Sequence, residues 1–260
     1  MIEDCKFEVS SKEFNTFLKA IENVNNNGVK LTVQKNCIEA LVLTDDNSSV
    51  VLYTKIMLIE DAPDEVVGEY IHVKDFKKFK LMLGMNTDDT FAFRVKRNAV
   101  YYSNGKIRSA KFALGDSSYE NQTRIDSSFF TKFENIMEMK LQRQELSQIV
   151  SLSKFASSSV DKVYFRCDEQ GKLVAEINDY DTSNNDCVTV EIGTPDKGAI
   201  EGQVIVKVKS VELLTFGGDD IELKCVDIAP PTAPAKREVL IVSYINSNIE
   251  VHYLLNSMRS

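Results

Sequence analysis

The stretch Phe7-Glu-Val-Ser-Ser-Lys-Glu-Phe-Asn-Thr-Phe-Leu18 has a second version later in the chain, Met139-Lys-Leu-Gln-Arg-Gln-Glu-Leu-Ser-Gln-Ile-Val150. At an offset of 132 residues, Glu13 aligns with Glu145, and the apolar residues that follow align as well. Both stretches begin with strand-like alternation and continue with the apolar spacing of an amphipathic helix. An offset this large is too long for a solenoid repeat. The chain is therefore predicted to contain one domain that has been duplicated.

The correspondence continues at an offset of 135 residues. Ile38-Glu-Ala40 aligns with Leu173-Val-Ala175, and the segment that starts at Val73 aligns with the segment that starts at Val208. Few aligned residues are identical, but strand-like and helix-like segments follow in the same order. A pseudo-symmetric chain of this kind often builds a larger symmetric assembly.

Apolar spacing and turn residues divide the first copy into short elements. We predict helices over Lys12–Asn23, with Ser11 as the N-cap, and over Val73–Leu83. The strands are predicted at Cys5–Ser10, Val29–Gln34, Cys37–Thr44, Val50–Met57, Thr90–Val95, Val100–Ser103 and Lys106–Leu114.

The second copy repeats this plan, with helices predicted over Gln142–Phe155 and Ser210–Phe216. Two helices cannot cover both faces of so many strands. We therefore predict an α+β fold in which the two helices of each copy lie on one face of antiparallel sheets. Domain 1 is predicted to span residues 1–115, a connecting loop residues 116–134, and domain 2 residues 135–260. The strands of the second copy are predicted at Ile136–Leu141, Lys162–Cys167, Leu173–Asn178, Cys187–Ile192, Gln203–Val208, Asp220–Asp227, Val239–Asn246 and Ile249–Leu254.

Composition places the chain among soluble globular proteins. It has 260 residues, of which 43% are hydrophobic and 27% charged, and no apolar run approaches the ~20 residues that span a bilayer. We expect no membrane association and see no signal peptide. Five widely spaced cysteines, an odd number without a CxxC, predict reduced thiols in an intracellular compartment. The net charge of −8 argues against a general nucleic-acid coat protein, but it does not exclude basic residues confined to one face.

The chain offers little catalytic chemistry. It lacks the GxGxxG, GxxxxGK[ST] and GxSxG motifs, and His72 and His252 are isolated from other metal-ligand residues. The acidic pairs Asp45-Asp46, Asp88-Asp89 and Asp219-Asp220 are interpreted as turn residues. The group Asp179, Asp181 and Asp186 lacks the spacing and closing Glu of a calcium loop. We predict no metal, no cofactor and no enzymatic activity, which favours a binding or scaffold role.

Basic residues follow the polar faces of the predicted helices. A solvated lysine face is the ordinary explanation for any one helix. If all four helices share one surface, however, that surface is basic in a chain that is acidic overall. Such a surface suits phosphate contacts without base readout. The residues concerned are Lys12, Lys19, Lys74, Lys77, Lys78, Lys154 and Lys209.

Over essentially its whole length the chain resembles the two-domain sliding clamps of DNA replication, those of T-even-type bacteriophages and the proliferating cell nuclear antigen. The resemblance is carried by the duplicated plan, the length, and the segments Tyr70–Phe79, Met139–Leu146 and Ile249–Leu255. It implies a homotrimeric ring around double-stranded DNA that tethers a DNA polymerase and is loaded by a clamp-loader ATPase. The divergence favours a viral, phage source, hence the host cytoplasm; a eukaryotic clamp would lie in the nucleus.

The resemblance also assigns residues. The helix-face lysines become DNA contacts, although Gln148 and Ser151 stand where cellular clamps carry basic residues. The subunit interface is expected at Lys106, Arg108, Lys111, Cys187, Val190 and Glu191. A pocket for a partner peptide is expected at Thr44, Ile125, Phe129, Pro230, Val251, Tyr253 and Leu254.

Three alternatives stay open at this point. A metal-dependent nuclease would use the paired carboxylates, and a non-enzymatic β-rich structural protein would have no nucleic-acid role. Within the connecting loop, Phe129 and Phe130 would pin the loop down, instead of lining a partner pocket or in addition to lining it.

Overall fold

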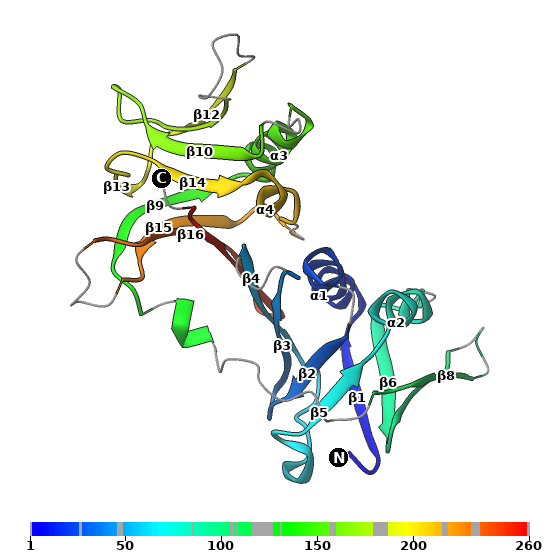
Figure 1. The fold of residues 1–260 in the computed structure, drawn as a ribbon. Helices are drawn as coiled ribbons and strands as arrows, with labels where there is room; N and C mark the ends of the chain where they lie inside the picture. The colour runs from blue at the N-terminus through cyan, green and yellow to red at the C-terminus, as the bar shows by residue number, and fades with distance from the viewer. Residues whose placement is uncertain are drawn as a thin grey trace. The chain divides into compact units, whose positions relative to one another are not determined.

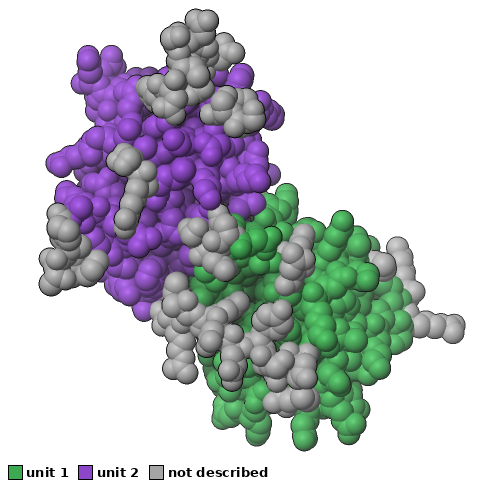
Figure 2. Space-filling model, viewed as in Figure 1, with its two compact units in different colours: residues 1–45, 52–126, 245–251 green, residues 46–51, 127–244, 252–260 purple. Residues whose placement is uncertain are grey.

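The computed structural model describes residues 2–25, 28–45, 49–84, 86–104, 107, 109–115, 127–130, 132–155, 160–178, 187–214, 218–229 and 235–258. The chain divides into two compact units. Unit 1 comprises residues 1–45, 52–126 and 245–251, and unit 2 comprises residues 46–51, 127–244 and 252–260 (Figure 2). Unit 1 thus includes the late segment 245–251, and unit 2 includes the early segment 46–51. None of the described helices is long and apolar enough to cross a membrane.

Unit 1 contains two antiparallel sheets and two helices (Figure 1). One sheet has the strand order β1-β6-β7-β8, and β4, β3, β2 and β5 follow one another in the second. The elements are β1 (Cys5–Ser10), α1 (Ser11–Val24), β2 (Val29–Val33), β3 (Cys37–Leu43), β4 (Val50–Met57), the 3-10 helix η1 (Asp64–Val66), β5 (Tyr70–Val73), α2 (Phe76–Leu83), β6 (Thr90–Lys96), β7 (Ala99–Tyr102) and β8 (Ala110–Ala113).

Unit 2 repeats the arrangement with the strand orders β9-β15-β16-β17 and β12-β11-β10-β14. A two-residue strand, β13 (Lys197–Gly198), is added beside β9. The other elements are η2 (Ser127–Phe130), β9 (Asn135–Leu141), α3 (Arg143–Ser151), η3 (Leu152–Phe155), β10 (Lys162–Cys167), β11 (Leu173–Ile177), β12 (Val188–Gly193), β14 (Val204–Lys207), α4 (Val208–Glu212), β15 (Ile221–Asp227), β16 (Glu238–Ile245) and β17 (Ile249–Asn256).

The two strand orders confirm the duplication. The sheet order β1-β6-β7-β8 of unit 1 corresponds to the order β9-β15-β16-β17 of unit 2. In the same way, the order β5-β2-β3-β4 corresponds to the order β14-β10-β11-β12. Only β13 has no counterpart among the described strands of unit 1. The correspondence of β8 with β17, and of β4 with β12, is used below.

The predicted apolar stripe of the first helix forms the core of unit 1. Phe14, Phe17, Leu18 and Ile21 are all buried. The Phe14 ring stacks on Phe91 and Phe93 of β6, with centroids 5.3 and 5.8 Å apart. Burial of aromatic side chains of this size is a large share of the stabilisation that a small core can provide. Helix α1 thereby packs against the β1-β6-β7-β8 sheet, and α2 lies beside α1 (Figure 1).

The second predicted helix begins later than expected. Val73 ends strand β5, and the helix starts at Phe76 because Asp75 acts as its N-cap. The Asp75 carboxylate accepts the backbone N–H of Lys78 at 3.0 Å, which satisfies a donor that the first helical turn leaves without a partner. The strand β5 pairs with β2 from Val29–Val73 to Thr32–Tyr70. The apolar alternation of Tyr70–Val73 therefore belongs to a strand and not to the helix.

The helices of unit 2 are also shorter than predicted. Helix α3 ends at Ser151 and continues as the 3-10 turn η3 to Phe155. Gln142 is the N-cap of α3, and its N–H donates to the Glu145 side chain at 2.6 Å, as in a capping box. Helix α4 begins two residues earlier than the predicted Ser210, since the Val208 N–H is held by the carbonyl oxygen of Asp161 at 2.8 Å. The sequence beyond Leu214, to Gly217, lies outside the described residues.

Candidate nucleic-acid and subunit surfaces

The helix-face lysines of unit 1 are all exposed. Lys12 and Lys19 lie on α1, Lys77 and Lys78 on α2, and Lys74 in the turn between β5 and α2. Each lies on the side of its element opposite to the buried apolar residues. The sequence pattern thus places five cations on the solvent side of two neighbouring helices. Phosphate groups are the ligands that such a face attracts without any base-specific contact.

Acidic side chains near these lysines are engaged locally. Glu22 of α1 forms an ion pair with Lys80 of α2, which ties the two helices together. Glu13 accepts a hydrogen bond from the Ser10 hydroxyl. Asp75 pairs with Lys78 at 3.1 Å. Hydrogen bonds from the backbone N–H and the side chain of Lys78 hold the pKa of the Asp75 carboxyl below its usual range. The α1–α2 face therefore keeps an excess of positive charge.

The corresponding face of unit 2 is less basic. Lys154 and Lys209 are exposed, as is Arg143 at the start of α3. Gln144, Ser147 and Gln148 fill much of the face between them and are neutral. Arg143 is missing from the sequence-based prediction, although its position one residue after the Gln142 N-cap is a usable signal. The predicted contrast between a basic first copy and a more neutral second copy is visible in the side chains that are exposed.

The predicted subunit-interface residues lie on end strands of the two units. Lys111 is exposed on β8, the last strand of its sheet order, and Val190 and Glu191 lie on β12, the end strand of its own. Cys187 directly precedes β12 and is exposed. Glu191 has a partner within its own chain, Lys172, at 2.7 Å. Two further interface residues, Lys106 and Arg108, lie outside the described residues.

A groove of about 510 Å³ runs between α3 and the end strand β12. Ser147 and Ser151 form its helix side, and Val188 and Val190 its strand side. Phe155 of η3 also lines the groove, and its side chain is 57% exposed. An exposed phenyl ring beside an unpaired strand edge is typical of a surface that another chain covers.

In unit 1, the start of β17 is already paired with β4. The Met57 N–H donates to the carbonyl oxygen of Asn248 at 2.8 Å, and the Thr54 hydroxyl donates to the carbonyl oxygen of Glu250 at 2.8 Å. Lys55 and Glu250 add an ion pair of 2.8 Å. Strand β4 therefore has a neighbour that its counterpart β12 lacks among the described residues.

The partner-pocket residues lie in different environments. Val251, Tyr253 and Leu254 of β17 are buried, with Tyr253 completely so, and none of the three presents a surface to a peptide. The resemblance to sliding clamps is the source of the prediction that these residues line a pocket, and it does not say which side chains of the strand are accessible. Thr44 and Phe129 are half-buried. Ile125 and Pro230 lie outside the described residues.

The described part of the connecting loop is anchored in unit 2. Phe130 is buried and stacks on the imidazole of His252, whose Nδ1 lies 2.8 Å from the Ser243 hydroxyl. Phe129 packs edge-on against Phe130 and Phe133. These contacts favour the interpretation in which the two phenylalanines pin the loop.

The five cysteines differ sharply in environment. Cys5, Cys37 and Cys225 are buried, Cys167 is half-buried and Cys187 is exposed. Burial raises the pKa of Cys37 to about 11 and that of Cys225 to about 12, because a thiolate is poorly solvated in the core. All five are free thiols.

The acidic residues do not gather into a metal centre within the part of the chain that the structure describes: no group of three or more His, Cys, Asp or Glu side chains could hold an ion there. Asp88 and Asp89 are exposed before β6, and Asp219 and Asp220 before β15. Asp46, Asp179, Asp181 and Asp186 lie outside the described residues.

The duplicated α+β units define the class of the fold, that of the DNA sliding clamps. Among the solved structures that the chain resembles are those of proliferating cell nuclear antigens. The structure of the Thermococcus kodakaraensis protein matches with a TM-score of 0.71 at 15% identity, over 98% of this chain and 100% of the other. The Entamoeba histolytica protein gives 0.71 at 11% identity, over 98% and 99%. A chain in the structure of the C-terminal region of FEN-1 bound to A. fulgidus PCNA gives 0.70 at 14% identity, over 98% and 99%.

Sequence comparisons alone do not reach these proteins. Neither the models of known protein families nor the curated protein sequences give a match. The chain thus has the sliding-clamp fold at an identity where sequence similarity has nearly disappeared.

Proposed function

We propose that the protein is a DNA sliding clamp, a non-enzymatic ring that encircles duplex DNA and tethers a replicative DNA polymerase. The proposal rests on the fold over nearly the full chain and on the exposed lysines of the α1–α2 face. Domain 1 is residues 1–115, the connecting loop residues 116–134 and domain 2 residues 135–260. The protein acts where DNA is replicated: the host cytoplasm for a phage clamp, the nucleus for a eukaryotic one.

The observation that carries ring formation is the pairing of β17 with β4 inside unit 1. Strand β8 is the counterpart of β17, and β12 is the counterpart of β4. Pairing of β8 in one copy with β12 in the next would repeat the same contact between chains. Because β8 and β12 lie in different units, the contact is head-to-tail, and such contacts close into rings when the rotation permits. We propose a homotrimer.

The lysine faces supply the DNA contacts of this ring. Their charge fits the phosphate backbone and reads no sequence, as a protein that slides along DNA requires. In the proposed ring, unit 1 carries most of the contact through Lys12, Lys19, Lys74, Lys77 and Lys78, and unit 2 adds Arg143, Lys154 and Lys209.

The proposed partners are a DNA polymerase and a clamp-loader ATPase. FEN-1 is named as the partner of PCNA in one of the similar structures, and a peptide-binding site at the connecting loop is proposed here by that analogy. Thr44 and Phe129, both half-buried, are its accessible members among the described residues. Tyr253 is buried and supports the site from below its surface.

The decisive experiment is primer extension on a singly primed circular template with the cognate polymerase and loader. The protein should lengthen the products made in one binding event, and it should do so only when the loader and ATP are present. Electron micrographs should show rings. Degradation of DNA with magnesium would support the nuclease alternative, and neither rings nor stimulation would leave a β-rich structural protein.

A further inference from the structure

One row of side chains crosses the whole outer face of the β1-β6-β7-β8 sheet. Lys6 of β1 lies opposite Arg94 of β6, Arg94 lies opposite Tyr101 of β7, and Tyr101 lies opposite Lys111 of β8. Their neighbours on the other face, such as Phe93, are buried beneath the helices. With strands about 4.8 Å apart, this outer row is about 14 Å long. It contains three cations and one aromatic ring.

The cations of this row project further than the acids that accompany them. Arg94 donates from Nε and Nη2 to Asp4, with the Nη2–Oδ2 distance at 2.7 Å, and Lys6 pairs with Glu8 at 3.4 Å. The side chains of Arg94 and Lys6 are 59% and 66% exposed, whereas those of Asp4 and Glu8 are 32% and 28% exposed. The acids offset the repulsion of two like charges placed directly opposite each other. An approaching ligand therefore meets the positive charges first.

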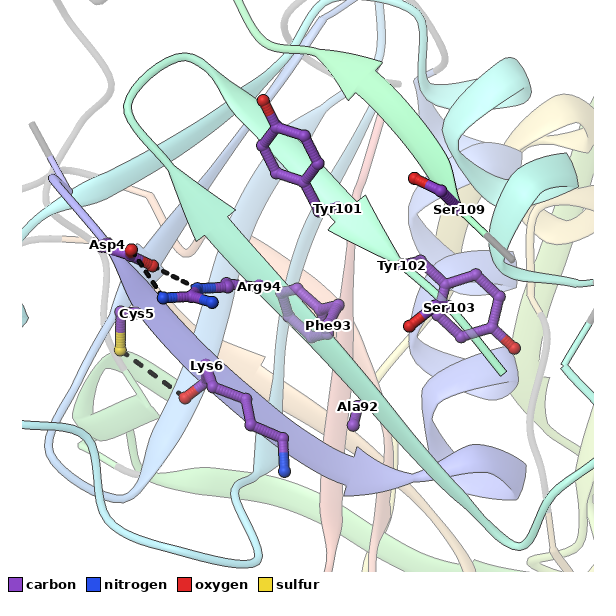
Figure 3. Close-up of a pocket in the computed structure, with 10 residues that line it drawn as sticks. All are labelled: Asp4, Cys5, Lys6, Ala92, Phe93, Arg94, Tyr101, Tyr102, Ser103 and Ser109. Atoms are coloured by element: carbon purple, nitrogen blue, oxygen red, sulfur yellow. Dashed lines mark hydrogen bonds and ion pairs between the residues drawn. The ribbon is translucent and has the colours of Figure 1, made fainter. Parts of the chain in front are cut away.

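A cavity of about 610 Å³ opens onto the same face (Figure 3). Its charged lining residues are Lys6, Arg94 and the Asp4 that pairs with Arg94, and Tyr101, Ser103 and Ser109 add hydroxyl groups. Figure 3 shows the Tyr101 ring on β7, with the Asp4–Arg94 pair on one side and Ser109 on the other. The volume is within the range of sites that hold small ligands or single nucleotides. Hydroxyl groups beside cations are common donors to phosphate oxygens.

We propose that this outer face binds a short segment of single-stranded nucleic acid, with a base stacked on Tyr101 and phosphates held by Lys6 and Arg94. An aromatic platform flanked by cations is the combination that single-strand-binding surfaces use. An acidic peptide would match the charges equally well, but it would not stack on the Tyr101 ring. The Nζ of Lys111 lies over that ring, 5.7 Å from its centroid, and a stacked base would share the ring with this cation or displace it. The inference goes beyond the proposed clamp function, in which the helix faces contact duplex DNA.

The test is the binding of a fluorescein-labelled twelve-nucleotide oligothymidylate, followed by fluorescence anisotropy. Tyr101→Leu keeps an apolar side chain but removes the ring, and should weaken binding by about fivefold or more. Tyr101→Phe keeps the ring and should bind like the wild type. Lys6→Gln should lower the slope of log affinity against log salt by about 0.7, the value for one phosphate of a single strand. Lys35→Gln, which removes an exposed lysine of unit 1 that pairs with Asp64 and lies outside both the outer row and the helix face, is the matched control and should leave oligothymidylate binding unchanged.

Wild-type affinity in both Tyr101→Leu and Lys6→Gln would overturn the proposal. If Tyr101→Leu fails to fold, Lys6→Gln decides alone. Displacement of the oligonucleotide by a twelve-residue oligoglutamate, together with unchanged binding by Tyr101→Leu, would assign the face to an acidic peptide and refute the nucleic-acid assignment. Failure of the clamp function appears separately, as loss of polymerase stimulation, because that readout depends on the helix faces and not on Tyr101.

Discussion

Phe130 lies nearly parallel to the imidazole of His252, with ring centroids 5.0 Å apart and an angle of 16° between the planes. One partner is in the 3-10 helix η2 of the connecting loop, and the other is in β17. This stack fixes the described end of the loop to the sheet of unit 2.

Phe130→Ala should release this end of the loop. A buried phenyl ring contributes a few kcal/mol, but the loss acts on a short segment, so local opening should increase more than global unfolding does. Limited proteolysis should cut the variant faster between residues 116 and 134 at an almost unchanged melting temperature. Phe129→Ala, at a half-buried position, is the control and should be cut at a rate closer to that of the wild type. Equal rates for all three proteins would contradict the anchoring role.

Removing the exposed lysines at the start of α2 and in the turn before it tests the duplex-binding face. The triple variant Lys74→Ala, Lys77→Ala and Lys78→Ala should bind duplex DNA more weakly, and the salt slope should fall by about 0.9 for each phosphate that the variant no longer neutralises. The side chains are exposed, so thermal stability should change little. Lys35→Ala removes an exposed lysine of unit 1 that pairs with Asp64 and should leave the slope unchanged. A wild-type slope in the triple variant would show that DNA does not meet this face.

Phe155→Asp tests the α3–β12 groove as a subunit interface. The ring is largely exposed within one chain, so the charge should not unfold the protein, but it would be buried on assembly. Light scattering should therefore report monomers. Ile245→Asp is a matched control, since Ile245 is exposed to a similar extent and lies on β16, which has neither β8 nor β12 as a neighbour in its sheet. A trimer in Phe155→Asp would move the interface elsewhere.

Two buried serines should respond to alanine in opposite directions. Ser210 is buried in α4, and its hydroxyl has no hydrogen-bond partner among the described residues. Ser210→Ala should raise the free energy of unfolding by about 1 kcal/mol, because a buried unsatisfied polar group is costly. The Ser243 hydroxyl forms a hydrogen bond with His252, so Ser243→Ala should lower the free energy of unfolding by about 1 kcal/mol. Urea denaturation measures both, and a destabilised Ser210→Ala would show that its hydroxyl has a partner.

The Asp75 cap should make the stability of α2 depend on pH in the acid range. Its pKa is lowered, first by the backbone N–H of Lys78, so the carboxylate favours the folded state. This contribution is complete above the ordinary Asp pKa and disappears as pH falls through the lowered value of the folded state. Asp75→Ala should therefore be less stable than the wild type at neutral pH, and the gap should narrow as the medium becomes strongly acidic. Denaturation curves at a series of pH values check this, and a constant gap would contradict the charged cap.

Periodicity predicted the duplicated plan and the core of α1 because Phe14, Phe17, Leu18 and Ile21 follow one helical face without interruption. It misplaced the start of α2, since Val73 suits a strand end and a helix equally well until the Asp75 cap is recognised. The exposed lysines could be found because they alternate with buried residues on short helices. The burial of Tyr253 could not be predicted from the sequence, because it depends on strands that are far away in the chain. The outer row was also hidden, since Lys6, Arg94, Tyr101 and Lys111 meet only through strand register.

Cys187 is the one exposed thiol of the five, all of which the structure describes. Desolvation raises the pKa of Cys187 as well as those of Cys37 and Cys225, so accessibility decides the reaction. A maleimide dye reaches the exposed Cys187 more readily than the buried thiols and should couple to it first. The wild-type chain therefore carries its own attachment point for a fluorophore, beside the strand β12 that the proposed ring would cover. Single-molecule brightness and quenching could then follow the opening and closing of the assembly on DNA, with no cysteine added or removed.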